Sequence, residues 1–506
     1  MSLAIIYSRA QVGIHAPLVT VEVHLSSGLP GLSIVGLPEA AVKESKDRVR
    51  SALINNRFDF PLRRITINLA PADLPKEGGR FDLPIALGIL AASGQIPVTP
   101  LANYEFVGEL ALTGELRLIR GVLPVALAAR GARRSLIVPE ENADEAALVA
   151  GATVLPSKHL LEVCAHLSNH TEIPAHTSTF KVPQPHNTDD LSDVRAQHHA
   201  KRALEIAAAG GHNLLMIGPP GTGKTMLASR LSGILPPMTE DQALSAAAVA
   251  SVSTLGFNMA QWKQRPFRSP HHTASGVALV GGGSHPGPGE ISLAHNGVLF
   301  LDELPEFDRR VLEVLRQPME SGHITISRAA HQADFPARFQ LIASMNPCPC
   351  GYLGDRSGRC HCTIDQVQRY RSRISGPLLD RIDMHIEVPS VAREVLLDQN
   401  RSRSDTSRAV QARVQSAYQR QLDRAGKSNG QLNNREVERF CRLSKSDLNL
   451  LESAIERLGL SARAMHRILK VARTVADLSG NDTIETPHLS EAISYRRLER
   501  LELQTA

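Results

Sequence analysis

A glycine-rich segment, GPPGTGKT, has the residue types and spacing needed to bind the phosphates of a nucleotide. It follows an apolar run from Leu214 to Ile217 and precedes a helical pattern. Glycines in such a turn let backbone N–H groups surround phosphate oxygens, and the N-terminus of the next helix adds positive charge. The lysine reaches the β- and γ-phosphates, and the hydroxyl after it binds Mg²⁺. The residues predicted to bind ATP in this way are Gly218, Gly221, Gly223, Lys224 and Thr225.

Two more apolar runs end in polar residues suited to hydrolysis. GVLFLDE predicts a buried strand that ends at Asp302 and Glu303, and FQLIASMN predicts another that ends at Asn346. Asp302 is expected to hold Mg²⁺ through water, Glu303 to polarise the attacking water, and Asn346 to orient that water. Each residue alone could be a cap after a strand. Together with the glycine-rich turn, the three predict ATP hydrolysis.

Hydrolysis also needs positive charge on the γ-phosphate, which a neighbouring subunit often supplies. Arg381 is the preferred candidate because it follows an apolar helix end and precedes a strand. LSARAMHRILKVART places Arg463 and Arg467 on one helical face, from which one could reach the nucleotide. The alternative for the arginine-rich segment before the strand is a solvated basic helix. Its arginines are Arg369, Arg371, Arg373 and Arg381.

Four of the six cysteines fall in the segment CPCGYLGDRSGRCHC. In a reducing compartment disulfides are disfavoured, and four thiolates suit a tetrahedral, structural Zn²⁺. An iron–sulfur cluster uses the same donors, and His361 is an alternative ligand, but nothing in the sequence indicates redox chemistry. The predicted zinc ligands are Cys348, Cys350, Cys360 and Cys362. Cys164 and Cys441 lie on apolar faces and are predicted to be core residues.

The composition predicts a large soluble protein that must hold these residues on several domains. The chain has 506 residues, of which 42% are hydrophobic and 21% charged, which suggests roughly three or four structural units. No apolar run reaches the ~18 residues of a membrane span, and no signal peptide is recognised, so a cytoplasmic protein is expected. The net charge of +5 permits a polyanionic partner.

Changes of pattern along the chain predict the domain limits. Short β-like and helical runs alternate at first, and a segment rich in His, Thr and Pro without periodicity then indicates a linker. An α/β unit with a parallel sheet follows, and the remainder has a helical pattern. The predicted division is residues 1–167, linker 168–190, ATPase core 191–391 with the cysteine insert at 348–362, and helical lid 392–506.

The order of these motifs resembles an AAA+ ATPase. The glycine-rich turn is followed by VLFLDE, SMN, LLDRID and SARAMHRIL. RPFRSPHHTASGVALVGGG and PGPGEISLAHNGVLFLDE are similar to the magnesium-chelatase-like branch, and the whole chain is identified as a member of the ComM/YifB family. The resemblance implies a homo-hexameric ring that uses ATP and Mg²⁺ for DNA branch migration during homologous integration in natural transformation, with recombination proteins as further partners. It assigns Arg381 as the finger for the neighbouring subunit and Arg463 as the lid sensor.

The first 167 residues resemble the α+β Lon-type peptidase fold. The matching segments are LAPADLPKEGGRFDLPIALGILAASGQI and VGELALTGELRLIRGVLPVALAARGARRSLIVPEEN. Arg80 stands at the serine position, and no lysine follows Val122-Leu123-Pro124. Because the nucleophile needs both a hydroxyl and a base, we expect a non-proteolytic assembly or substrate platform. Its basic residues either contact DNA phosphates or form a solvated face: Lys76, Arg80, Arg130, Arg133 and Arg134.

Two readings of the motor therefore stay open: a DNA motor, and a protein remodeller or chelatase-type motor subunit. SGHITISRAAHQADFPAR predicts a β-hairpin carrying Arg328, and GVALVGGGSHPGPGE predicts a second loop. Either contacts DNA or is only structural. His271 and His272 have no third ligand nearby, so local hydrogen bonds are expected rather than a metal.

Overall fold

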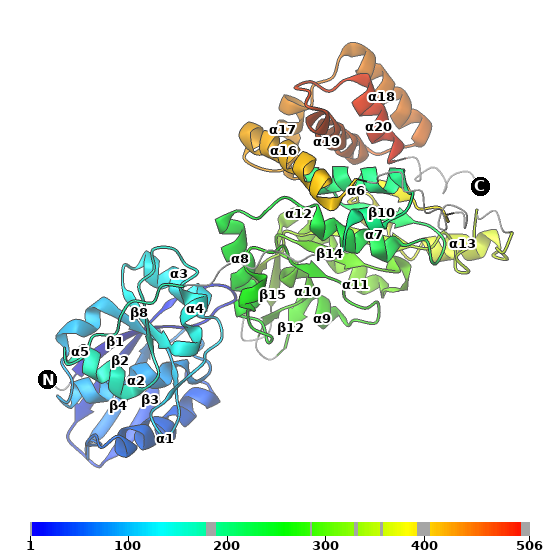
Figure 1. Ribbon diagram of the computed structural model, residues 1–506. Coiled ribbons are helices and arrows are strands. Elements are labelled where there is room, and N and C mark those ends of the chain that lie inside the picture. The colour runs from blue at the N-terminus through cyan, green and yellow to red at the C-terminus, as the bar shows by residue number, and fades with distance from the viewer. Residues whose placement is uncertain are drawn as a thin grey trace.

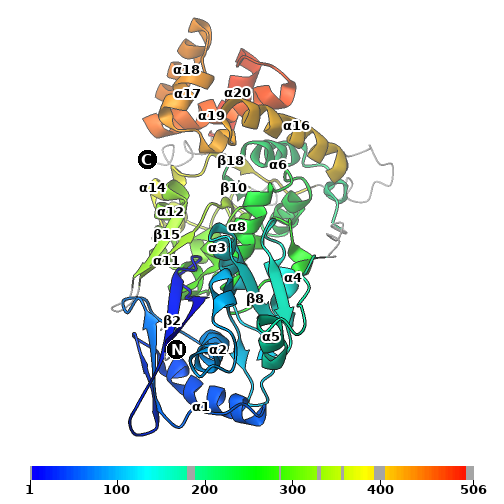
Figure 2. The same cartoon turned by 90° about the vertical axis from the view of Figure 1, so that its left-hand side faces the viewer.

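The computed structural model describes residues 3–178, 189–283, 286–327, 332–354, 358–391 and 405–496. Figures 1 and 2 show three parts along the molecule: an N-terminal α/β region, a central region built on a parallel sheet, and a helical C-terminal region. This confirms the predicted mixed α/β class with a parallel core and a helical end. Among the described residues, no helix is both long and apolar enough to cross a membrane.

The N-terminal region begins with a four-stranded sheet in the order β1-β2-β4-β3. β1, β2 and β4 are antiparallel, and β3 runs parallel to β4. All eleven residues of α2 are buried, because it is apolar on every side except at Asp82, whose carboxylate pairs with Arg48. The elements are β1 (Leu3–Arg9), β2 (Leu18–Ser26), β3 (Gly31–Val35), α1 (Ala40–Asn55), β4 (Arg64–Ala70) and α2 (Asp82–Ala92).

A second, three-stranded parallel sheet in the order β5-β8-β9 completes this region. A short β6–β7 hairpin lies between β5 and α3 in the chain. The elements are β5 (Tyr104–Phe106), β6 (Glu109–Leu110), β7 (Leu116–Arg117), α3 (Val122–Gly131), β8 (Ser135–Pro139), α4 (Ala143–Ala146), β9 (Val154–Ser157) and α5 (Leu160–Leu167).

The central sheet has five parallel strands in the order β11-β14-β17-β10-β18. β14 and β17 are buried at every residue, as expected of a parallel sheet covered on both faces. Since β17 lies between β10 and β14, the carboxyl ends of these three strands meet at one edge. The strands are β10 (Leu214–Ile217), β11 (Phe267–Arg268), β14 (Val298–Leu301), β17 (Gln340–Met345) and β18 (Met384–Glu387).

Helices and two hairpins surround this sheet. The helices are α6 (His198–Gly210), α7 (Lys224–Arg230), α8 (Glu240–Ser251), α9 (Gly276–Val280), α10 (Glu290–Leu293), α11 (Arg309–Val314), α12 (Arg316–Ser321), α13 (Ile364–Arg371) and α14 (Gly376–Leu379). The hairpins are β12 (Gly281–Gly282) with β13 (Gly287–Pro288), and β15 (His323–Ser327) with β16 (Gln332–Pro336). Both predicted loops therefore form hairpins, although Arg328 lies outside the described residues.

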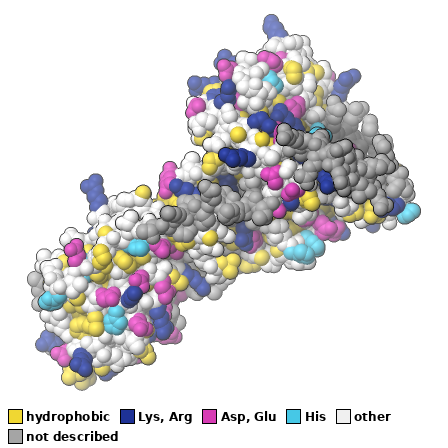
Figure 3. Space-filling view, in the orientation of Figure 1, with side chains coloured by type: hydrophobic (Ala, Val, Ile, Leu, Met, Phe, Trp, Pro, Cys, Tyr) yellow, Lys and Arg dark blue, Asp and Glu magenta, His cyan; other side chains and the backbone are white. Residues whose placement is uncertain are grey.

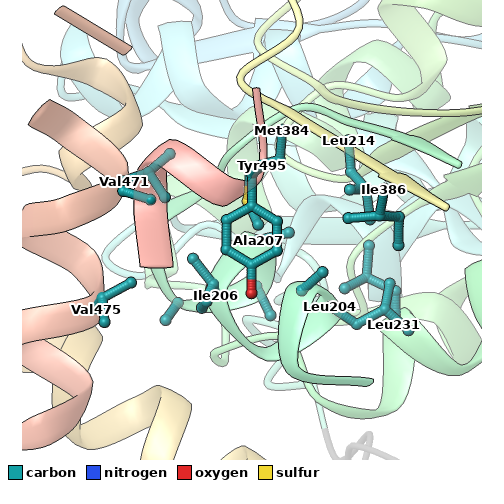
Figure 4. Close-up of a cluster of buried hydrophobic side chains, with 14 of the residues drawn as sticks. Leu204, Ile206, Ala207, Leu214, Leu231, Met384, Ile386, Val471, Val475 and Tyr495 are labelled. Carbon is teal, nitrogen blue, oxygen red and sulfur yellow. The ribbon is translucent and has the colours of Figure 1, made fainter. Parts of the chain in front are cut away.

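The C-terminal helices pack on α6. Figure 4 shows Val471 and Val475 facing Ile206 and Ala207, with Tyr495 beside them. His212, two residues after the end of α6, is also linked to α19 by a 2.7 Å contact between its Nε2 and the Thr474 hydroxyl. The helices are α16 (Ser407–Ala425), α17 (Asn434–Phe440), α18 (Lys445–Leu458), α19 (Ala462–Ser479) and α20 (Thr486–Ser494).

One hydrophobic cluster joins the N-terminal region to the central region. Val122 and Ala126 of α3 pack in the same cluster as Ala243 and Ala247 of α8, with Trp262 beside them. Small side chains on α8 allow the two helices to approach closely. An apolar contact thus joins the N-terminal region to the central one.

Candidate nucleotide-binding site

The turn between β10 and α7 has the conformation that its glycines allow. Gly221 and Gly223 have φ angles of 76° and 84°, in the left-handed region that favours glycine. A Cβ atom on Gly218 would lie 2.1 Å from the carbonyl oxygen of Val388. Glycine is therefore required at these positions for backbone or steric reasons.

The Lys224 side chain points back into this turn. Its Nζ donates hydrogen bonds to the carbonyl oxygens of Gly218 at 2.7 Å and Pro219 at 2.9 Å, and to Asn346 Oδ1 at 3.2 Å. Burial lowers the pKa of Lys224, while the charges of Asp302 and Glu303 act in the opposite direction. The structure thus places the predicted lysine and the predicted sensor amide together.

Three hydrogen bonds converge on the Asp302 carboxylate at the same edge of the sheet. The Thr225 hydroxyl donates to Asp302 Oδ2 at 2.7 Å, and the Ser344 hydroxyl donates to Oδ1. The Glu303 backbone N–H also donates to Oδ1, at 3.1 Å. Sequence reasoning missed Ser344, which lies on β17 two residues before Asn346.

Glu303 follows in a left-handed conformation, with φ of 54°. Its side chain is exposed, and its Oε2 lies 3.6 Å from His272 Nδ1. The His271 ring stacks on His272 at 4.1 Å and contacts the Thr273 hydroxyl at 2.9 Å, the kind of local hydrogen bond that was predicted. The contact between His272 and Glu303 was not predicted, because no spacing in the sequence signals it.

Arg381 is held inside its own chain. Its guanidinium pairs with Glu320 at 2.5 Å and donates to the Pro377 carbonyl oxygen at 2.7 Å, and its side chain is 8% exposed. It lies directly before β18, at the opposite edge of the sheet from Lys224. Of the other arginines, Arg373 is exposed and paired with Glu306, and Arg371 donates to the Pro347 carbonyl oxygen. Arg369 is exposed.

Arg463 and Arg467, both on α19, differ in their exposure and partners. Arg467 pairs with Asp383 at 2.5 Å, and Asp383 accepts from the backbone N–H of Asn213 at 2.8 Å. Both partners directly precede strands, so Arg467 lies at the amino edge of the sheet, away from Lys224 of its own chain. Of the two arginines on this helical face, Arg467 is thus engaged by Asp383 in its own chain. Arg463 is exposed in the first turn of α19.

Three family descriptions match the chain: "Magnesium chelatase, subunit ChlI" over residues 190–396, "Subunit ChlI of Mg-chelatase" over 21–142, and "Magnesium chelatase, subunit ChlI C-terminal" over 404–496. Competence protein ComM of Haemophilus influenzae is 56% identical over 505 residues, which cover 99% of both chains. This chain belongs to the ComM/YifB family of magnesium-chelatase-like proteins. The uncharacterized YifB proteins of Salmonella typhimurium and Escherichia coli are 53% and 52% identical, each covering 99% of this chain and 98% of its own.

In this ComM/YifB-family chain the four clustered cysteines converge. Their Sγ atoms all lie within 4.8 Å of one another, with Cys348 at 3.3 Å from Cys350 and 3.8 Å from Cys360. Zn–S bonds of ~2.3 Å in a tetrahedron imply S–S separations of about 3.8 Å, so the donor set fits zinc. Backbone hydrogen bonding by Tyr352 lowers the pKa of Cys350 to about 6, which favours the thiolate. The described group consists of sulfur ligands and does not include His361.

The cysteine cluster touches the phosphate-binding turn. A Cβ atom on Gly351 would lie 2.7 Å from Pro220 Cδ and 3.8 Å from Asn346 Cγ. The Leu353 backbone N–H also contacts Cys348 Sγ at 3.3 Å, so the loop wraps around its own sulfur. The remaining cysteines, Cys164 and Cys441, are buried as predicted, and burial raises the pKa of each to about 12.

The N-terminal basic residues do not form one surface. Lys76 and Arg80 are buried, and burial lowers the pKa of Arg80 to about 10. Both proposed roles for these two residues, DNA contact and a solvated face, are therefore wrong in this structure. Arg134 is half-buried and pairs with Glu105, which leaves Arg130 and Arg133 exposed. On the face seen in Figure 3, basic side chains are interspersed with acidic ones.

Proposed function

We propose that this protein is an ATP-driven DNA motor that works as a cytoplasmic homo-hexameric ring and moves DNA branches during homologous integration in natural transformation. The observation that carries the proposal is the convergence of Lys224, Asp302, Glu303 and Asn346 at one edge of a parallel sheet. The full-length similarity to a protein named for competence supports the biological setting.

Each residue at this edge has a role in the proposed hydrolysis. Lys224, with Gly218, Gly221 and Gly223, holds the phosphates of ATP, while Thr225 and Asp302 hold Mg²⁺. Bound Mg²⁺ supplies positive charge to the β- and γ-phosphates. Glu303 polarises the attacking water, and Asn346, whose amide oxygen already contacts Lys224, orients it. Ser344 and the Glu303 backbone N–H fix the direction of the Asp302 carboxylate.

The placement of the arginines supports the proposed ring. Because Arg381 lies at the amino edge of its own sheet, its charge serves the nucleotide of a neighbouring subunit whose carboxyl edge faces it. To do so it exchanges Glu320 for the γ-phosphate. Arg463, exposed at the start of α19, is the proposed lid sensor, and Arg373 is the alternative finger because it is already exposed.

The proposal includes a structural Zn²⁺ bound by Cys348, Cys350, Cys360 and Cys362. It also includes a non-proteolytic Lon-like domain at 1–167, a linker at 168–190, an ATPase core at 191–391 and a lid at 392–506. The zinc stiffens the loop between Asn346 and the arginine-rich helix α13. Recombination proteins are the further partners that a role in integration requires.

A second candidate is a chelatase-type motor subunit or protein remodeller. The matching family descriptions name magnesium chelatase, which favours it. The two candidates share the same hydrolysis site and differ in what the ring pulls on.

The deciding experiment measures ATP turnover with no DNA and with single-stranded, duplex and branched DNA, using Lys224→Ala as the control for contaminating ATPases. We expect DNA, above all single-stranded or branched DNA, to raise turnover, and affinity to fall steeply with salt because phosphate contacts release counterions. Movement of a three- or four-way junction should require ATP. If no nucleic acid changes turnover or oligomeric state, the remodeller becomes the better assignment.

A further inference from the structure

Arg80 is a buried cation that ATP hydrolysis does not use. It is 8% exposed, and its Nη2 donates to Gln11 Oε1 at 2.6 Å and to the carbonyl oxygen of Arg120 at 2.9 Å. These two acceptors belong to two turns that are distant in the sequence. Both turns contact the ATPase core.

The first turn is the tip of the hairpin between β1 and β2. Val12 and His15 exchange two backbone hydrogen bonds of 2.9 Å, which leaves Gly13 and Ile14 at the tip. The Ile14 side chain packs against the hydrophobic cluster of the ATPase core that contains Ile326. Gly13 is so close to β16 that a Cβ atom on it would lie 2.8 Å from the Asp334 carbonyl oxygen. In Figure 2 the tip of this hairpin lies beside β15.

The second turn precedes α3. The Gly121 backbone N–H donates to the Ser251 carbonyl oxygen of α8 at 3.0 Å. A Cβ atom on Gly121 would lie 2.7 Å from Gln11 Oε1 and 3.4 Å from a methyl group of Val252. Gln11, Gly121 and Val252 therefore meet at one point, and Arg80 binds both sides of it.

A cleft also lies at this joint, lined in part by Gln11 and Gly13. A cavity of about 280 Å³ remains between the loop that carries Asp73 and Glu77, the tip at Gln11–Gly13, and Gln332 and Ala333 of β16. Strand β16 and Pro286 of the ATPase core thus line one side of a cleft whose remaining lining residues come from the N-terminal region.

From these contacts we propose that Arg80 is an inter-domain bracket, which clamps the 11–15 turn and the 120–121 turn onto β16 and α8 of the ATPase core. Nη2 donates both bonds, because its two N–H groups point at two acceptors at once within the fixed plane of the guanidinium. The bracket makes the N-terminal region a rigid extension of the core, so that a movement of β16 or α8 carries that region with it. The proposal stands on these contacts and depends neither on DNA binding nor on the peptidase resemblance.

Hydrogen exchange of the full-length protein without nucleotide or DNA tests the bracket. Arg80→Met keeps the apolar stem and removes the donors, so amides at 11–15 and 119–122, including that of Gly121, should exchange at least about tenfold faster. The β2 and β4 amides should be unchanged. Arg134→Met is the matched control, because Arg134 loses comparable bonds to Glu105 and Ala102 within the N-terminal region.

Gln11→Leu keeps the test decisive if Arg80→Met does not fold. It should increase exchange at 11–15, where adding Arg80→Met should produce little further increase because both changes remove the same Arg80–Gln11 bond. At 119–122 the added Arg80→Met should increase exchange further, because only it removes the bond to the Arg120 carbonyl oxygen. Basal ATP turnover should stay within about twofold of the wild type. The proposal is overturned if exchange at both turns is unchanged, or if it rises equally in β2 and β4, which would make Arg80 an ordinary core residue.

Discussion

Lys76 and Lys224 are both buried lysines beside proline- and glycine-containing turns, yet their surroundings differ. The Lys76 ammonium donates to the Pro71 carbonyl oxygen, and burial lowers its pKa with only Asp73 opposing. Lys224 is also buried, but two carboxylates, Asp302 and Glu303, oppose the same effect. The exposed Thr225 hydroxyl, the Asn346 amide and the Glu303 carboxylate lie around Lys224. A buried lysine is therefore not a ligand site unless such groups surround it.

The largest predicted effect is the difference between alanine substitutions of these two lysines. Lys224→Ala should abolish ATP binding and lower hydrolysis on the order of a hundredfold or more. Lys76→Ala should leave ATP affinity unchanged and lower the free energy of unfolding by about 1 to 3 kcal/mol. Titration with a fluorescent ATP analogue and thermal unfolding of both variants measure the two effects. Reduced ATP affinity in Lys76→Ala would contradict the comparison.

The next effect concerns hydrolysis without loss of binding. Glu303→Gln should bind ATP but hydrolyse it on the order of 10²- to 10⁴-fold more slowly, because the general base is lost. Arg381→Ala should bind ATP and lose about 10³-fold or more in rate. Mixed rings of the two variants contain some interfaces with both residues intact and should regain activity. If mixing restores nothing, Arg381 is not the finger, and Arg373→Ala is the variant to examine.

The cysteine cluster packs against the turn that holds Lys224. Among the described residues, no such cluster lies beside Lys76. Cys348→Ser combined with Cys350→Ser should lose about one zinc per chain and weaken assembly, while ATP binding is retained. Elemental analysis and sedimentation measure both. Cys164→Ser is the control, since that thiol is buried elsewhere in the core. Iron in place of zinc, or a metal-free wild-type ring with full activity, would refute this assignment.

Two histidines, His212 and His385, are also buried, where the C-terminal helices pack on the central region. Burial lowers the pKa of His212 to about 4 and of His385 to about 3, compared with ~6.5 in an unfolded chain. Both are neutral in the folded state, so the unfolded state binds more protons below pH 6.5. Stability should therefore be maintained above pH 6.5 and fall progressively between about pH 6.5 and 4. Thermal unfolding between pH 7.5 and 5 measures this, and His212→Asn should make the dependence weaker.

The last prediction is that the protein has no proteolytic activity. The purified protein should not cleave casein, with or without ATP, because Arg80 is neither a nucleophile nor a base. Arg80→Ser should not create activity, since a hydroxyl without a base is unreactive. Cleavage that persists in Lys224→Ala and co-purifies with the chain would show that the N-terminal region is a working peptidase.

Much of the nucleotide site could be predicted because its residues directly follow strands. Asp302, Glu303 and Asn346 converge with Lys224 as expected from the ends of three parallel strands, β14, β17 and β10. The partners that were missed, His272 for Glu303 and Glu320 for Arg381, come from separate elements, so spacing carries no signal for them. The parallel core and helical end were predicted from periodicity. The burial of Lys76 and Arg80 was not, because their hydrogen-bond partners in the N-terminal region, the Pro71 carbonyl for Lys76 and Gln11 with the Arg120 carbonyl for Arg80, carry no signal in the sequence.

The alanine-rich face of α8 has a consequence for how the protein can be divided. Ala243, Ala246 and Ala247 are buried in the cluster shared with α3. A chain shortened to its ATPase and lid regions would present this face and Trp262 to water, and the exposed apolar patch would favour aggregation. A naturally shorter relative would need polar side chains at 243, 246 and 247. The residues at these three positions therefore form a sequence signature that reports whether a motor of this kind carries an N-terminal domain.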